Sequence, residues 1–134
     1  MKRHTTLLAL LALFVLATGA LAAGSVLHQG SWSKKGYDIE GQWKIVADGG
    51  KNYVELDDAF RTKNAPDLKI FLSPKGLPQL NGANATQQAV LVAKLSSNKG
   101  AQRYAIPAGT DLGAFRTIII HCEKYSKLRG GSSL

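Results

Sequence analysis

The stretch that decides the fold is QWKIVADGGKNYVEL, residues 42–56. Apolar side chains alternate with polar ones before and after its two glycines, with Trp43 and Ile45 on one side of the turn and Val54 and Leu56 on the other. Alternation with a period of two is typical of a half-buried strand. A Gly-Gly pair supplies the positive φ angles that a tight turn needs. This stretch therefore predicts a β-hairpin.

Segments on both sides of this hairpin also have the composition of short strands, and turn residues separate them. Residues 89–95 fit either a strand or a short helix, and the turn-like residues 96–100 that follow favour a strand. The other predicted strands are Ser25 to Trp32, Leu68 to Leu72, Gln102 to Ile106 and Phe115 to Cys122. The pattern predicts an all-β fold: a single β-sandwich, jelly-roll or immunoglobulin-like, of about seven to nine short antiparallel strands. Residues 76–88, rich in Gly, Asn and Gln, are expected to form a long exposed loop.

The N-terminus has the three parts of a secretory signal peptide. Lys2 and Arg3 form a basic start, Leu7 to Leu16 is an apolar run, and Ala20-Leu21-Ala22 is a cleavage motif. We expect a signal helix at residues 1–22, followed by a domain at 23–134 that works in the periplasm or outside the cell. The alternative is an uncleaved membrane anchor, because the apolar segment is just long enough to span a bilayer.

Length and composition limit the class of protein. A chain of 134 residues supports one domain, and a single cysteine excludes an internal disulfide framework or a multi-cysteine zinc site. Removal of residues 1–22 takes away Lys2 and Arg3, which lowers the formal net charge from +8 to +6. A basic protein outside the cytoplasm is not expected to meet nucleic acid. Its charge suits anionic lipid headgroups, acidic polysaccharide or simple solubility.

The sequence lacks the usual catalytic patterns. It contains neither a GxxxxGK[ST] phosphate-binding loop nor a G-x-S-x-G nucleophile elbow. We therefore expect a protein that is not an enzyme, with no catalytic residues and no metal site.

His121 and Cys122 end the most β-branched stretch of the chain and are the main candidates for chemistry. Adjacent strand residues point to opposite faces, so the two side chains are expected to diverge. Cys122 would share its face with isoleucines, which is typical of a buried structural thiol. A redox thiol, an axial ligand to a prosthetic group and an intermolecular disulfide are the alternatives.

Several motifs in a fixed order carry a resemblance to a known family. They are Pro66-Asp67-Leu68, then Gly100-Ala101-Gln102-Arg103-Tyr104-Ala105-Ile106-Pro107, then a strand ending in Cys122. The chain resembles the DM-13 domain, often called the electron-transfer DM-13 domain and often found beside DOMON domains, from about Leu27 to Leu134. The resemblance implies a β-sandwich with a redox or electron-transfer role outside the cytoplasm. It also implies that Cys122 is the redox centre and that a redox partner protein or an envelope component is the partner.

Three positions depart from the family pattern. His121 stands where many members have Trp, Ala65 where many have Gly, and Tyr37 near the second strand where relatives often have His. The cofactor stays open. A haem would have to use His28 with His121, or Cys122 alone, and the chain has no C-x-x-C-H motif for covalent attachment.

The remaining motif residues have structural interpretations beside functional ones. Asp67 is expected to hold a turn through its carboxylate, with contact to a partner as the alternative. Gln102 and Tyr104 are expected to pack and hydrogen bond rather than to form a binding site. The aromatic residues fit a buried core, or else a sugar-stacking platform made by Trp32, Tyr37, Trp43 and Tyr53. The second function class is therefore a non-catalytic envelope binding or structural module for a polysaccharide, a lipid surface or a protein, with Cys122 buried.

Overall fold

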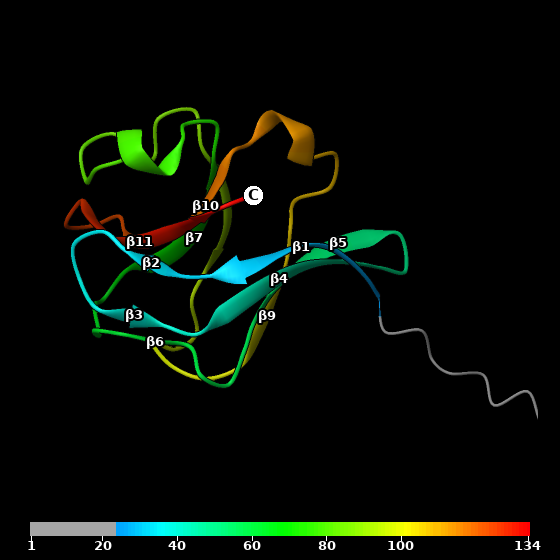
Figure 1. Ribbon diagram of the computed structural model, residues 1–134, viewed down its shortest axis with the longest axis horizontal. Helices are drawn as coiled ribbons and strands as arrows, with labels where there is room; N and C mark the ends of the chain where they lie inside the picture. Colours follow the sequence, from blue (N-terminus) through cyan, green and yellow to red (C-terminus); the bar gives the residue numbers. More distant parts are fainter. Residues whose placement is uncertain (1–23) are drawn as a thin grey trace, which may run out of the picture.

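The computed structural model describes residues 24–134, which form a β-sandwich of two antiparallel sheets (Figure 1). Sheet I has the order β1-β4-β5-β9, and sheet II has the order β2-β11-β10-β7-β8. The strands of sheet I are β1 (Ser25–Ser31), β4 (Gln42–Asp48), β5 (Lys51–Leu56) and β9 (Gln102–Ala105). The strands of sheet II are β2 (Ser33–Lys34), β7 (Leu68–Ser73), β8 (Val90–Lys94), β10 (Thr117–Cys122) and β11 (Lys127–Ser133). The all-β sandwich predicted from the alternating segments is confirmed.

Short elements connect and close the sandwich. Strands β3 (Ile39–Glu40) and β6 (Arg61–Thr62) pair with each other at one end. Two single turns of 3-10 helix, η1 (Leu77–Gln79) and η2 (Leu112–Ala114), are the helical elements of the described part of the chain. Among residues 24–134, no helix is long and apolar enough to cross a membrane. The predicted signal helix at residues 1–22 lies outside the described residues.

The predicted hairpin forms as expected. Strands β4 and β5 pair from Trp43 opposite Leu56 to Asp48 opposite Lys51, so Gly49 and Gly50 are the only two loop residues. Both glycines have positive φ, at 57° and 80°. A two-residue turn with this geometry matches the twist of its strands, and glycine adopts it without strain.

The core lies between the two sheets. Sheet I contributes Trp43, Ile45, Val54 and Leu56, and sheet II contributes the inward side chains of β7 and β10. These residues are the alternating apolar positions of each strand, which explains why a period of two in the sequence predicted them. Residues 89–95, for which helix and strand were both open, are a strand at Val90–Lys94.

Strand β11 was not predicted, and its glycines explain why. It has the sequence KLRGGSS and lies inside sheet II between β10 and β2. A Cβ atom on Gly130 would lie 2.4 Å from the carbonyl oxygen of Ser33, and one on Gly131 would lie 2.7 Å from Leu77. Glycine is required because β2 and η1 pack directly on this backbone, and glycine otherwise weakens a strand prediction.

The expectation of an exposed loop at residues 76–88 is wrong in part. Leu80 and Ala85 are buried and pack against Phe71, Ile119 and Leu128 on the outer face of sheet II. Figure 1 shows this segment, with η1, above β11 and β7. The loop therefore covers a second apolar cluster, and the central strands of sheet II, β7 and β10, are buried on both faces.

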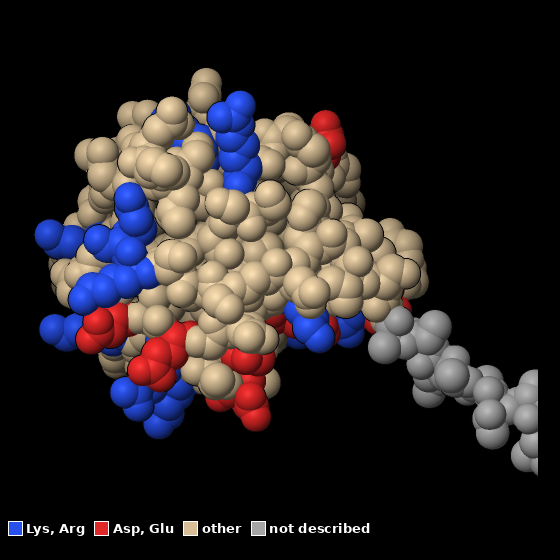
Figure 2. All heavy atoms as spheres, viewed as in Figure 1, with Lys and Arg blue, Asp and Glu red and all other residues tan. Residues whose placement is uncertain are grey.

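Charged side chains are unevenly distributed over the surface. Figure 2 shows Lys and Arg side chains gathered at the end of the molecule beside β2 and β11, with Asp and Glu below them. The middle of the same face carries few charged atoms.

Candidate functional site

Cys122 is the last residue of β10, and its side chain is completely buried. It pairs with Leu68 of β7 on one side and with Lys127 of β11 on the other. Its thiol belongs to the core between the sheets, together with Ile118 and Ile120. A reagent or partner can therefore reach the sulfur only if this end of the strand opens.

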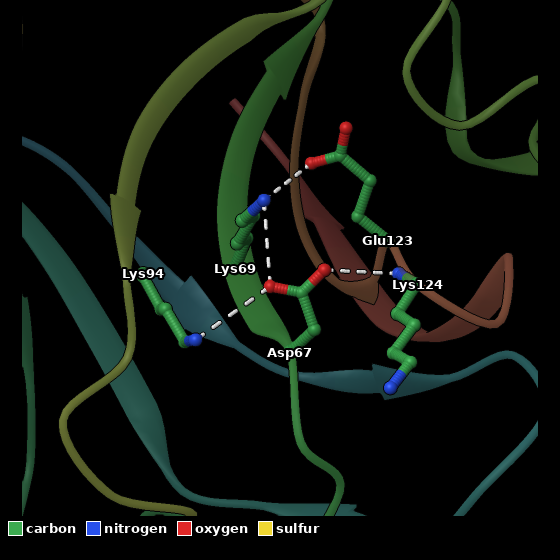
Figure 3. Close-up of polar contacts among 5 residues, drawn as sticks. All are labelled: Asp67, Lys69, Lys94, Glu123 and Lys124. Carbon is green, nitrogen blue, oxygen red and sulfur yellow. Dashed lines mark hydrogen bonds and ion pairs between the residues drawn. The ribbon is translucent and has the colours of Figure 1, made fainter.

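Asp67 fastens the chain immediately after Cys122 (Figure 3). Its backbone oxygen accepts a hydrogen bond from the N–H of Glu123 at 3.2 Å, and its carboxylate accepts one from the N–H of Lys124 at 3.0 Å. These bonds join the start of β7 to the turn between β10 and β11. The expected turn-holding role of Asp67 is confirmed, but the turn that it holds is 57 residues away in the chain.

Lysine side chains complete this network. Lys69 contacts the carboxylate of Glu123 at 2.7 Å and that of Asp67 at 3.4 Å, and Lys94 lies 3.9 Å from Asp67. The hydrogen bond to Glu123 is the main cause that raises the pKa of Lys69, opposed by partial desolvation. Asp67 is mostly buried, so its hydrogen bonds are worth more than those of an exposed ion pair.

His121 points to the opposite face from Cys122, as strand alternation predicted. Its side chain is 2% exposed and contacts the ring of Phe71 edge-on, at 6.1 Å between ring centroids. Its Nδ1 atom has no hydrogen-bond partner among residues 24–134. Burial lowers the pKa of His121, and the nearby charge of Arg129 lowers it further, while Glu123 and Asp67 act in the opposite direction. The imidazole is therefore held neutral and cannot share a ligand with the thiol of Cys122.

The motif around Gln102 and Tyr104 supports a loop. The amide oxygen of Gln102 accepts a hydrogen bond from the N–H of Ser97 at 3.2 Å, and the hydroxyl of Tyr104 accepts one from the N–H of Ser96 at 2.7 Å. The hydroxyl of Tyr104 also donates to the amide oxygen of Gln102. Pro107 follows directly after β9 and ends it. These bonds organise the segment between β8 and β9.

Comparison with known proteins agrees with this geometry. The family model described as electron transfer DM13 matches residues 31–130, which include the Pro66-Asp67-Leu68 motif, residues 100–107 and Cys122. The chain belongs to the electron transfer DM13 family. No curated protein and no solved structure matches it. Membership in this family identifies the chain as an electron-transfer module. Such a module implies a redox partner.

The DM13 motifs are brought together only in part. Pro66, Asp67 and Leu68 meet Cys122 at one end of sheet II, whereas Gln102 and Tyr104 lie in sheet I. His28 is half-buried in β1 and pairs with Ile45, also in sheet I.

The residues that could ligate a haem do not suit one. His28, His121 and Cys122 lie on different sheets or opposite faces of one strand, as described above. Five pockets of about 250 to 580 Å³ on the described part of the chain are all lined by other residues. Within residues 24–134 there is also no group of three or more His, Cys, Asp or Glu side chains that could hold a metal ion.

For the two tryptophans, the expected alternatives are decided in favour of the core. Trp43 is 1% exposed and Trp32 is 7% exposed, with their ring centroids 6.2 Å apart. Trp32 lies where the chain passes from β1 to β2 and also packs on Phe60. A sugar-stacking platform that includes both tryptophans is therefore ruled out in this fold.

One polar residue of the site region was missed by the sequence analysis. Arg129 in β11 is 4% exposed, although arginine is seldom buried. An arginine between a leucine and two glycines carries no strand pattern, so nothing in the sequence marked it as buried.

Proposed function

We propose that this DM13 protein is an exported, non-catalytic redox module whose electron-transfer centre is the thiol of Cys122. Residues 1–22 are its export signal, which directs it to the periplasm or the cell exterior, or its membrane anchor if they are not cleaved. Its partner is a redox protein or another component of the envelope.

The observation that carries this proposal is the pairing of Leu68 with Cys122. The Pro66-Asp67-Leu68 motif and the cysteine are the most specific parts of the family pattern, and they are distant in sequence. Asp67 then binds the two residues that follow the cysteine. A motif that served only packing would have no need of a mostly buried carboxylate at this point.

The chemistry open to a single thiol is exchange with a disulfide of the partner. The Cys122 sulfur, as thiolate, attacks one sulfur of the partner's disulfide and forms a mixed disulfide. The second partner sulfur leaves as a thiolate, and the proton of Cys122 goes to solvent. The step needs no further oxidant, because the partner's disulfide accepts the electron pair. It requires local opening at the turn that Asp67 holds.

The rate at which Cys122 reacts with a thiol reagent tests this access step. Replacement Asp67→Asn weakens the hydrogen bond to Lys124 and the ion pair with Lys69. Since a hydrogen bond to a charged group contributes about 1.5–3 kcal/mol, we expect labelling of the folded protein to become about tenfold faster or more. Asp48→Asn is the matched control, because Asp48 makes an ion pair with Arg103 in sheet I, away from the cysteine.

Formation of a mixed disulfide tests the redox role itself. The folded protein is incubated with a small disulfide such as oxidised glutathione, and the product is measured by mass. We expect a mixed disulfide that forms faster in Asp67→Asn and is absent in Cys122→Ser. If Cys122 reacts only at the rate of global unfolding in the native protein and in both aspartate variants, the redox proposal fails.

The complete burial of Cys122 favours a second candidate function, an envelope binding or structural module in which the thiol is only part of the core. That function predicts that Cys122→Ser lowers the free energy of unfolding by about 1 kcal/mol or more, because it puts a hydroxyl group in an apolar site. Cys122→Ala, which adds no polar group, separates this penalty from lost packing. Chemical denaturation of the three proteins measures both.

A further inference from the structure

Strand β1 lies at the edge of sheet I. It pairs with β4 on one side, and no strand among residues 24–134 pairs with it on the other side. In an antiparallel pair, alternate residues turn their N–H and C=O groups away from the neighbouring strand. Strand β1 therefore presents a row of backbone donors and acceptors with which a further strand can pair.

The other three edges of sheets I and II each carry an exposed basic side chain. Strand β2 carries Lys34, β8 carries Lys94 and β9 carries Arg103. Charged side chains on an edge strand, lysine above all, oppose pairing with another chain. Strands β8 and β9 also contact each other, so these two edges are partly covered.

Strand β1 lacks this protection and exposes aliphatic side chains instead. Its sequence, SVLHQGS, contains no Lys, Arg, Asp or Glu. Val26 is 48% exposed and Leu27 is 44% exposed. Strand β1 crosses the middle of the face that carries few charged atoms (Figures 1 and 2). Adjacent apolar side chains on an uncharged, unpaired edge are typical of a site that binds another strand.

The two apolar residues lie next to a regular stretch of this edge. Val26 is paired with Val46, so apolar side chains on the outer face of sheet I continue to its edge. The register shifts between Val26 and His28, which makes Leu27 the extra residue of a β-bulge. A bulge can turn an edge away from a partner, but this one affects a single position. Residues 28–31 continue in regular register with β4.

We propose that β1 is the contact surface of a dimer, in which it pairs antiparallel with β1 of a second copy of this chain about a two-fold axis. Such a contact joins the same surface of both copies. The chain has a formal net charge of +8, so two copies repel each other where their basic surfaces meet. An uncharged edge avoids that repulsion, and every second copy presents the same open edge.

The dimer would join two four-stranded sheets into one continuous sheet. Its energy comes from backbone hydrogen bonds between the two strands and from removal of Val26 and Leu27 from water. The contact is independent of the redox role of Cys122, which belongs to sheet II.

The molecular mass as a function of concentration tests the proposal. Sedimentation of the purified protein is measured from micromolar to millimolar concentration, in a reducing buffer so that a disulfide through Cys122 cannot contribute. We expect a reversible equilibrium between monomer and dimer. A monomer at every concentration overturns the proposal and leaves β1 open to a strand of another protein.

Leu27→Lys and Leu91→Lys form a matched pair of variants. Both leucines are 44% exposed, both lie in edge strands, and both substitutions add one positive charge. Leu27→Lys brings like charges together at the two-fold axis, so we expect the dissociation constant of the dimer to rise about tenfold or more. Leu91→Lys, in β8, should leave it unchanged. An equal rise in both variants would show that net charge controls association, and overturns the proposal.

Hydrogen exchange locates the contact within the dimer. The outward N–H groups of residues 25–31 should exchange more slowly as concentration rises, in proportion to the fraction of dimer, because they become hydrogen bonded. The exchange of β9 should not change with concentration, and in Leu27→Lys the slowing in β1 should be lost. A dimer in which β1 exchanges as fast as in the monomer associates through another surface, which overturns the proposal.

Discussion

Sheet I and sheet II are built from the same kind of strand but differ in how they are covered. In β5 of sheet I, Val54 and Leu56 are buried and the residue before each of them is half-buried, whereas every residue of β10 in sheet II is buried. The outer face of sheet I carries Arg103, which pairs with Asp48 and Glu55 and lies over the ring of Tyr53. The outer face of sheet II is closed by residues 76–88. All three unusual buried side chains, His121, Cys122 and Arg129, belong to the doubly covered sheet.

This difference determines which sheet shields polar and reactive side chains from solvent. A sheet with one solvent-exposed face can carry charged side chains on that face at little energetic cost, because water solvates them. A sheet covered on both faces isolates each polar group, so that a thiol, an imidazole or a guanidinium there has few partners and a strong effect on stability.

The largest expected effect comes from shortening an outward side chain of sheet II. Ile119 is on the outer face yet 0% exposed, whereas Val26 on the outer face of sheet I is 48% exposed. Ile119→Ala should lower the free energy of unfolding by about 2–5 kcal/mol, because it leaves a cavity. Val26→Ala should change it by no more than about 0.5 kcal/mol. Equal losses in chemical denaturation would show that the loop does not cover the sheet.

The dependence of stability on pH should come from the same covered face. Because burial lowers the pKa of His121 below its ordinary value of 6.5, the unfolded chain binds a proton that the folded chain does not. The free energy of unfolding should therefore fall as pH drops from 7 through 6.5, and level off once the pH is below the pKa of the folded state. The slope for one proton cannot exceed about 1.4 kcal/mol per pH unit.

His121→Gln should remove this part of the slope, and His28→Gln, a histidine of sheet I, should keep it. Thermal or chemical unfolding at pH 5, 6 and 7 measures the difference. The same slope in all three proteins would mean that His121 does not cause it.

The smallest effect is expected on the outer face of sheet I. Asp48 is the main cause that raises the pKa of Arg103, although that side chain is exposed to solvent. Arg103→Ala should lower the melting temperature by only about 1–3 °C. The difference should shrink in roughly 1 M salt, which screens exposed ion pairs. A larger effect that salt does not reduce would mean that the contact with Tyr53 is the stronger interaction.

The parts of the fold that alternate apolar and polar residues could be predicted, and the parts shaped by close packing could not. The β4–β5 hairpin follows from local pattern and two glycines. Strand β11 could not be predicted because its glycines are required by close contacts with β2 and η1, which are distant in sequence. The same is true of residues 76–88, whose polar composition hides the burial of Leu80 and Ala85.

The candidate site divides in the same way. The opposite directions of His121 and Cys122 follow from strand geometry alone. The link from Asp67 to the turn after Cys122 depends on the register between β7 and β10, which no local pattern reveals. The burial of Arg129 depends on its contact with the ring of Tyr37 and on the shift in register between β10 and β11, and both are properties of the folded chain.

The position of β11 has a consequence for the order in which the protein is assembled. Among the strands of residues 24–134, β2 pairs only with β11, and β11 also covers the open side of β10. Sheet II can therefore form completely only after residues 127–133 have been synthesised. Sheet I lacks this dependence in its β1–β4–β5 part, which can form from residues 25–56. Contacts between segments so distant in sequence form slowly. Because Cys122 pairs with Lys127 of β11, its thiol becomes fully enclosed only after this late segment has been added to the sheet.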